Sequence, residues 1–119
     1  MYCEMLWTID QGFLKDSDWV TWARSEDASS RAVAGPPGHP NPGHFAEVNV
    51  YAGPAMLLRA IHKAVGDEAF FAMGRDWVQR NRNTQVDRAE FIQHVNEHTG
   101  RDFTALINSW LDSPTTPPA

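Results

Sequence analysis

Two histidines close to the C-terminus have a spacing that suits metal binding. They belong to the segment His94-Val95-Asn96-Glu97-His98, which has the His-x-x-Glu-His order found at some zinc sites. On a helix, residues four positions apart lie one above the other, so both imidazoles can reach one metal ion. A catalytic zinc ion also needs a third protein ligand, and this segment does not supply it.

The neighbouring residues favour a solvated helix face here instead of a zinc site. The apolar face of this helix is expected at Phe91, Ile92 and Val95. His94 and His98 then lie beside that face, partly in water. Because the chain has five histidines, a chance pair at this spacing is also easy to obtain. We therefore predict no metal ligand here, and the weaker alternative is a stand-alone inverted zincin that uses His94, Glu97 and His98.

Other reactive side chains lack the partners that catalysis requires. His39 and His44 lie in a segment rich in glycine and proline, without a nearby cluster of carboxylates or cysteines, and are expected to face solvent. The candidate nucleophiles are Ser29, Ser30, Ser109 and Cys3. None of them has a base at a recognisable spacing, so we predict no nucleophilic catalysis.

Length and composition predict one packed domain that binds neither nucleic acid nor membrane. The chain has 119 residues, of which 42% are hydrophobic, and it contains five tryptophans. Its net charge is −5, and duplex nucleic acid instead favours clustered Lys and Arg. No apolar stretch approaches the roughly 18 to 20 residues that a membrane helix needs.

The cysteine count and the N-terminal residues give information about the cellular compartment of the protein. A single cysteine, Cys3, excludes an internal disulfide and a four-cysteine zinc site. The N-terminal residues Met1-Tyr2-Cys3-Glu4 have no basic region leading into an apolar run, so no signal peptide is apparent. The sequence leaves the location open and favours the cytoplasm.

Apolar spacing predicts an all-α fold of four to five short antiparallel helices. The first is expected from about Asp16 to Arg24, with Asp16 or Ser17 as its N-cap. An irregular loop should follow, because four prolines between residues 36 and 42 remove donors and fix φ. The predicted segments are 1–28, the Gly/Pro-rich loop 29–47, a helical domain 48–113 and a flexible tail 114–119.

Helical periodicity is clearest after residue 48. Helices are expected at 51–65, 68–81 and 88–99, and another after Asp102. Pro54 suits a first helical turn, and Asp67 is expected to cap the second of these helices. Asp87 with Glu90 forms a capping box for the third, which Gly100 ends.

Several short motifs follow one another in this region. They are Val50-Tyr51-Ala52-Gly53-Pro54-Ala55-Met56-Leu57-Leu58, Gly66-Asp67-Glu68-Ala69-Phe70-Phe71, Asp87-Arg88-Ala89-Glu90-Phe91-Ile92, Gly100-Arg101-Asp102-Phe103 and Trp110-Leu111. In this order they resemble the end of the catalytic region in M1-family zinc aminopeptidases, particularly the shorter bacterial type. Linked motifs in the right order are more specific than any one of them.

The resemblance extends to the N-terminal segment Ile9-Asp10-Gln11-Gly12-Phe13, which is similar to the family's Asn-Glu-Gly-Phe. That glutamate is the family's third zinc ligand, and Gln11, whose neutral amide is a weaker ligand, stands at its position. The family's His-Glu-x-x-His helix, which supplies the other ligands and the base, has no counterpart here. Tyr51 falls on the tyrosine that stabilises the oxyanion. The resemblance therefore implies no zinc in this chain, although the complete family binds it.

Two hypotheses of different class follow. In the first, the chain is a fragment or degenerate copy of an M1-like zinc aminopeptidase, inactive alone because zinc ligands and general base are missing. In the alternative, it is a non-enzymatic helical module that binds a protein through apolar surface. Either way, self-association or an association with a missing upstream domain is expected.

Overall fold

The computed structural model describes residues 1–44 and 46–118, and this part of the chain is all-α. It contains α1 (Tyr2–Asp10), α2 (Asp16–Ala34), α3 (Asn49–Val65), α4 (Asp67–Arg80), α5 (Arg88–Thr99) and α6 (Thr104–Asp112). The predicted fold class is thus confirmed, and the six helices exceed the four to five that were expected. The additional helix is α1, within the segment predicted only as 1–28.

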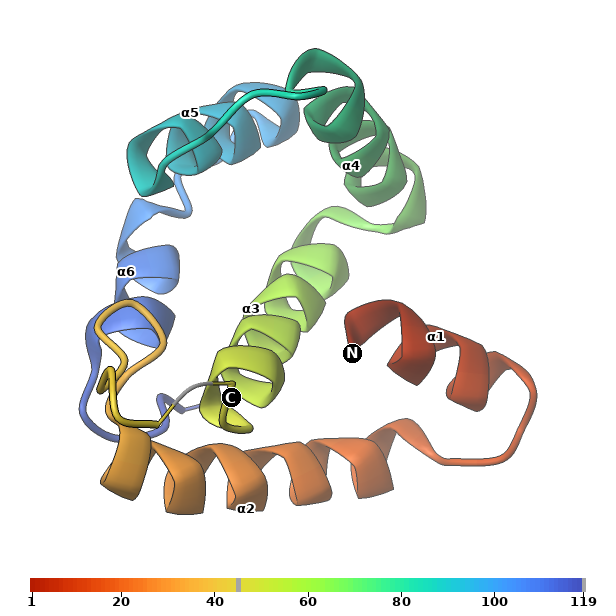
Figure 1. Cartoon of the computed structure of the whole chain (residues 1–119). Helices are drawn as coiled ribbons and strands as arrows, with labels where there is room; N and C mark the ends of the chain where they lie inside the picture. The colour runs from red at the N-terminus through yellow and green to blue at the C-terminus, as the bar shows by residue number, and fades with distance from the viewer. Residues whose placement is uncertain (45, 119) are drawn as a thin grey trace.

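Helix α3 lies at the centre of the molecule, and the other helices surround it (Figure 1). It packs against α1, α2, α4 and α6, while α5 packs against α4 and α6. Ile61 of α3, Val95 of α5 and Ile107 of α6 are completely buried, and Trp110 is nearly so. The apolar stripe expected after Asp102 therefore forms part of the core.

Helix ends that depend on local chemistry were predicted correctly. The Asp87 side chain accepts from the Glu90 amide at 2.9 Å, and the Glu90 carboxylate accepts from the Asp87 amide at 2.8 Å. This is the predicted capping box. Gly100 ends α5 with φ of 64°, in the left-handed region that favours glycine.

The prediction that residue 29 begins a loop was wrong. Helix α2 continues to Ala34, ten residues beyond the expected end at Arg24. The reason is a completely buried ion pair on this helix, between Asp27 and Arg31, with Arg31 Nη2 2.9 Å from Asp27 Oδ1. Because these residues are four positions apart, the pair forms only if the helix continues through both of them.

The Asp27–Arg31 pair joins α2 to distant parts of the chain. Arg31 donates to the carbonyl of Trp110 at 3.2 Å and to that of Ser113 at 2.8 Å. Thr116 donates its hydroxyl to Asp27 at 2.6 Å. All charged and polar groups of the pair thus have partners, which a buried ion pair requires.

Tail residues 114–118 are non-helical, as expected, and they pack against α2. Besides the Thr116 contact, the Pro117 carbonyl accepts from Arg24 Nη1 at 2.8 Å, and Pro117 is buried. These contacts differ from the flexible tail that the sequence suggested. The expectation for residue 119 lies outside the described residues.

Two predicted caps were wrong because their carboxylates bind side chains. Helix α2 has Lys15 as its N-cap, while Asp16 forms an ion pair with Arg59 and lies 2.9 Å from Lys63 Nζ. Asp67 is the first residue of α4 and lies 2.8 Å from His62 Nε2. Both aspartates therefore contact α3.

Helix α3 begins earlier than predicted. It starts at Asn49, so Pro54 lies inside the helix and beyond the first turn that was expected for it. The Asn49 amide donates to the Gly35 carbonyl, which attaches this helix start to the Gly/Pro-rich loop. The loop itself runs from Gly35 instead of residue 29.

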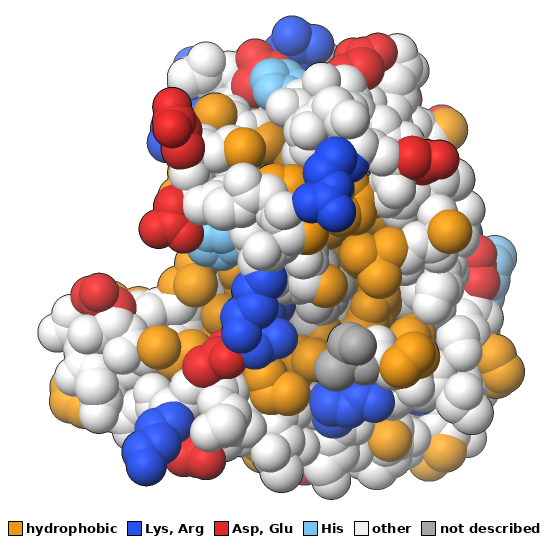
Figure 2. Space-filling model, turned by 180° about the vertical axis from the view of Figure 1, so that it is seen from behind, with side chains coloured by type: hydrophobic (Ala, Val, Ile, Leu, Met, Phe, Trp, Pro, Cys, Tyr) orange, Lys and Arg blue, Asp and Glu red, His pale blue; other side chains and the backbone are white. Residues whose placement is uncertain are grey.

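The surface carries charges of both signs. Seen from behind, several Lys and Arg side chains lie over a band of apolar side chains, and most Asp and Glu lie toward the edges (Figure 2). None of the helices described here has the length and apolar composition to cross a membrane. The Cα radius of gyration is 14.4 Å, slightly above the roughly 13.5 Å typical of a compact chain of this length.

Candidate functional site

The structure does not bring together the two positions that the M1 resemblance singles out. Gln11 is the exposed C-cap of α1, and its amide donates to Asp10 at 3.0 Å. Tyr51 lies in the first turn of α3 and is 46% exposed. The end of α1 and the start of α3 lie well apart in Figure 1. These residues therefore form no joint site within this chain.

Tyr51 lies beside the Gly/Pro-rich loop instead. A hollow of about 270 Å³ between this loop and the start of α3 is lined by Tyr51, His44 and two prolines, Pro40 and Pro42. His44 Nδ1 lies 3.6 Å from a Glu47 carboxylate oxygen, and the histidine is partly exposed. The hollow thus offers a phenol and an imidazole, and the imidazole has a carboxylate beside it.

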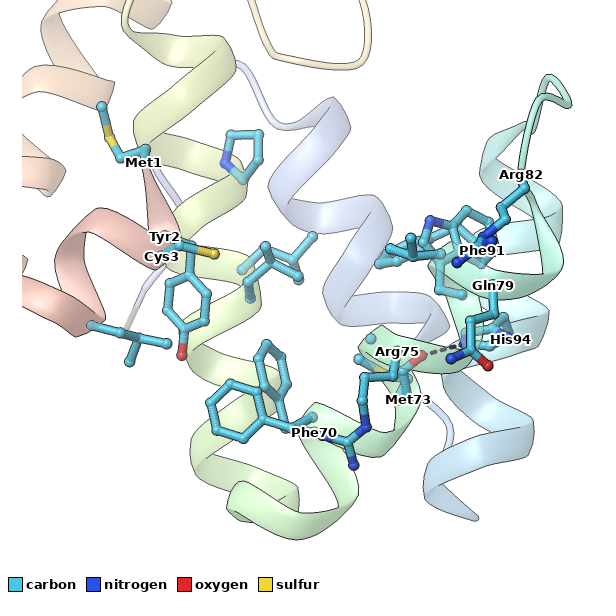
Figure 3. A pocket seen from close by; sticks show the side chains of 18 of the residues that line it. Met1, Tyr2, Cys3, Phe70, Met73, Arg75, Gln79, Arg82, Phe91 and His94 are labelled. Atoms are coloured by element: carbon cyan, nitrogen blue, oxygen red, sulfur yellow. Dashed lines mark hydrogen bonds between the residues drawn. The ribbon is translucent and has the colours of Figure 1, made fainter.

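His94 is buried, contrary to the prediction that it lies partly in water. Only 6% of it is exposed. Its Nε2 lies 2.9 Å from the backbone carbonyl oxygen of Met73 in α4, as the dashed line in Figure 3 marks. The sequence pattern missed this burial because the covering surface belongs to α4 and not to the helix itself.

The His-x-x-Glu-His segment lacks a third protein ligand for a metal ion, and α4 places a carboxylate at the corresponding position. Asp76 offers a carboxylate oxygen that, with one nitrogen each of His94 and His98, forms a set of atoms within 4.8 Å of one another. Asp76 Oδ2 lies 2.7 Å from His98 Nε2 and 3.9 Å from His94 Nδ1. We call these three residues the Asp-His-His cluster.

The charge of Asp76 is stabilised by its surroundings. Desolvation raises the pKa of its carboxyl group, but the hydrogen bond with His98 and the positive charge of Arg80 outweigh this and lower the pKa below its usual range. Arg80 Nε lies 2.6 Å from the same Oδ2 atom. The cluster therefore holds an ionised carboxylate between two imidazoles.

Glu97 does not belong to the cluster. It is exposed, and its carboxylate accepts from the Gln93 amide at 2.7 Å along the surface of α5. Asp76 takes its place as the acidic member, although nothing in the local sequence around the histidines indicates this. Only the packing of α4 against α5 brings it there.

A large apolar groove lies between the N-terminal residues and α4. Its volume is about 930 Å³, and it is lined by parts of residues 1–6, 54–58 and 70–82, with Phe91, His94 and Leu111. Figure 3 shows Met1 and Cys3 on one side of the opening and Phe91 with Arg82 on the other. Phe71 and Val78 of α4 are 43% and 64% exposed there, which is unusual for apolar side chains grouped together.

The charge of the groove differs from that of the whole chain. The chain has a net charge of −5, yet the described residues that line the groove include no Asp or Glu. Arg75 and Arg82 are its charged side chains, and within the described part of the chain neither forms an ion pair. The groove is thus a basic, apolar surface on an acidic protein.

Gly74 lies in the middle of α4 and lines the groove. A Cβ atom added to it would meet nothing within 4 Å among the described residues. A glycine in a helix interior is less stable than alanine by about 0.5–1 kcal/mol. No contact within the described residues explains why position 74 holds glycine instead of the more stabilising alanine.

Comparison with protein-family models, with curated proteins and with solved structures gave no match for this chain. The relation to M1 aminopeptidases therefore stays a prediction from the motifs. The groove and the Asp-His-His cluster have to be interpreted from their own chemistry.

Proposed function

We propose that this chain is a non-catalytic helical module that binds an amphipathic helix of a partner protein in the apolar groove. The observation that carries this proposal is the combination of exposed apolar side chains with an unpaired basic rim. The proposed partner helix has one apolar face with Asp or Glu along its edges, because such edges would meet Arg75 and Arg82.

A helix is the favoured ligand because of the shape of the groove floor. Gly74 leaves space at the backbone of α4, and the distance between packed helices depends on side-chain size at their contact. A partner helix can therefore approach α4 closely beside Gly74. Apolar residues of this helix, at the spacing of successive turns, would then cover Phe71 and Val78.

A fluorescent peptide provides the test. The probe is an 18-residue helical peptide with leucines on one face and glutamates beside them, and binding is measured by fluorescence anisotropy. Phe71→Glu and Val78→Glu each place a charge in the groove and should weaken binding at least tenfold. Both side chains are exposed enough that folding should survive, which circular dichroism checks.

A matched control lies on α2. Val33 is 61% exposed, about as much as Val78, and does not line the groove. Val33→Glu should leave the affinity unchanged. Equal losses in the Val33→Glu and Val78→Glu variants, or no binding by the unmodified chain, would contradict the proposal. The other candidate occupant of the groove is a second copy of this chain. Light scattering at two concentrations tests it, since a molecular mass that doubles would assign the groove to that second copy.

A second candidate function rests on the exposure of Tyr51. In this second proposal, the chain is the inactive helical portion of an M1-like zinc aminopeptidase, with Tyr51 presented to a site built by another region. The motif order and the open position of this phenol at the start of α3 support that proposal. The chain alone, supplied with Zn²⁺, should not hydrolyse an aminoacyl anilide. Hydrolysis that disappears in Tyr51→Phe would contradict the predicted inactivity.

A further inference from the structure

We propose that Asp76, His94 and His98 bind one divalent transition-metal ion of the zinc type between α4 and α5. This proposal does not rest on the helix-binding function, although His94 also lines the groove. Two imidazoles and one carboxylate are a ligand set that suits Zn²⁺, Co²⁺ or Ni²⁺, whereas Mg²⁺ and Ca²⁺ prefer oxygen ligands alone.

His94 is already oriented as a metal ligand. Its Nε2 lies 2.9 Å from the Met73 carbonyl oxygen, and since a carbonyl can only accept, this nitrogen must carry the proton. In the neutral ring Nδ1 then keeps its lone pair, and it is the nitrogen that lies 3.9 Å from Asp76 Oδ2. A hydrogen bond from the second ring nitrogen to a backbone carbonyl is the usual way in which proteins fix a metal-binding histidine.

The distances between the donor atoms fit a common metal after a small movement. With bonds near 2.0–2.1 Å, two ligands of a tetrahedral zinc ion are roughly 3.3 Å apart. The observed distances from Asp76 Oδ2 are 2.7 Å to His98 and 3.9 Å to His94, one shorter and one longer than this value. All donor atoms lie within 4.8 Å of one another, and the His98 side chain is 27% exposed.

Metal binding requires two changes near Asp76, the loss of a proton and the movement of a side chain. His98 Nε2 has to lose the proton it shares with Asp76, so the metal competes with that proton. Arg80, whose side chain is 61% exposed, must leave the Asp76 oxygen and turn into solvent. Neither change disturbs the core, because the buried member, His94, keeps its hydrogen bond to Met73.

The site would join α4 to α5 and leave one coordination position for water. Three protein ligands with a fourth open position are typical of zinc sites that are not purely structural. Glu97 is directed toward Gln93 and away from the cluster, so the described residues place no general base beside the ion. We therefore assign binding and no reaction to this site.

Calorimetric titration of the chelator-treated chain with Zn²⁺ tests the proposal. We expect one site near unit stoichiometry, and Asp76→Asn and His98→Ala should each weaken it at least tenfold. These two residues are partly exposed, so their variants should fold, whereas His94 is buried and is not needed for the test. A double variant, His39→Ala with His44→Ala, removes surface histidines elsewhere and should bind as the unmodified chain does.

Other results would overturn the proposal. Loss of the site in the His39/His44 double variant, or only weak binding at several sites, would assign the metal to scattered surface histidines. Unchanged binding in both Asp76→Asn and His98→Ala would do the same. A second readout is thermal unfolding, where Zn²⁺ should raise the midpoint of the unmodified chain and not of Asp76→Asn. Peptide binding in Asp76→Asn should stay unchanged, so the two proposals can fail separately.

Discussion

The two sides of the molecule differ in whether contacts within the chain explain their unusual residues. On the closed side, where α2, α3 and α6 meet, a charged pair is buried and a glycine lies inside the central helix. Gly53 is explained at once, since a Cβ atom there would lie 2.5 Å from Asp27 Oδ1 and 3.0 Å from Arg31 Nη2. The buried pair and Gly53 thus both have an intramolecular reason.

The open side, formed by α1, α4 and α5, lacks such reasons. Gly74 has no neighbour that would exclude a side chain, and Arg75 and Arg82 have no acidic partner among the described residues. The Asp-His-His cluster is only partly buried. The difference teaches that contacts within the chain explain the unusual residues of the closed side, and it supports the proposal that the open side binds a partner.

The largest expected effect comes from breaking the buried pair. Arg31→Met leaves the Asp27 carboxylate buried without its countercharge and should reduce the free energy of unfolding by about 3–5 kcal/mol. Urea denaturation followed by circular dichroism measures this. A double variant, Asp27→Leu with Arg31→Met, removes both charges and should be more stable than Arg31→Met alone. A double variant as unstable as the single one would contradict this explanation.

The same substitution at the two glycines should act in opposite directions. Gly53→Ala forces a methyl group against Asp27 and should destabilise the chain by about 1–3 kcal/mol. Gly74→Ala meets open space and should stabilise it by about 0.4–1 kcal/mol. Midpoints of urea unfolding at equal m values report both changes. A destabilising Gly74→Ala would show that an intramolecular constraint does act on this side.

Tyr2 attaches α1 to α3, and this attachment should weaken at high pH. Burial raises the pKa of its phenol to about 12, and the hydroxyl hydrogen-bonds His62 at 2.6 Å. A raised pKa means that the fold favours the neutral phenol. Its contribution is therefore complete below the unfolded value near 10 and is lost as pH rises toward 12. Tyr2→Phe should show a smaller loss of stability over this range in urea titrations.

The smallest expected effect concerns Asp16 at the start of α2. Its hydrogen bonds to Arg59 hold the pKa of the carboxyl group well below its usual range. Its contribution to stability is therefore present above pH 4 and lost as the pH falls through the lowered value. Because the side chain is 39% exposed, Asp16→Asn should cost only about 0.5 kcal/mol at neutral pH. Equal stability loss at pH 2 and pH 7 would contradict this account.

Sequence reasoning succeeded where neighbouring residues decide the structure. The Asp87–Glu90 box and Gly100 depend on atoms a few positions apart, so their patterns are sufficient. Helix α1 was missed because Met1 provides no side-chain cap and the segment has no clear end signals. The extension of α2 was missed because the polar stretch around Asp27 and Arg31 looks solvent-exposed until Trp110 and the tail cover it.

The candidate sites depend on contacts between helices, which sequence patterns do not contain. The histidine spacing on α5 was evident, but Asp76 lies on α4 and reaches the histidines only through packing. Exposed apolar surface was expected as an alternative, whereas the position of Gly74 at that surface required the structure. Glu97 shows the reverse case, because it belonged to the weaker alternative from the motif, whereas its carboxylate bonds Gln93 along the surface of α5.

A charge exchange at the rim of the groove tests the central claim most directly. The measurement compares the affinities of two helical peptides with the same leucine face, one edged with glutamate and the other with lysine. The unmodified chain should prefer the acidic peptide at least tenfold. The double variant Arg75→Glu with Arg82→Glu should prefer the basic one. An unchanged preference in that variant, or equal affinities throughout, would contradict the assignment of the open side to an acidic amphipathic helix.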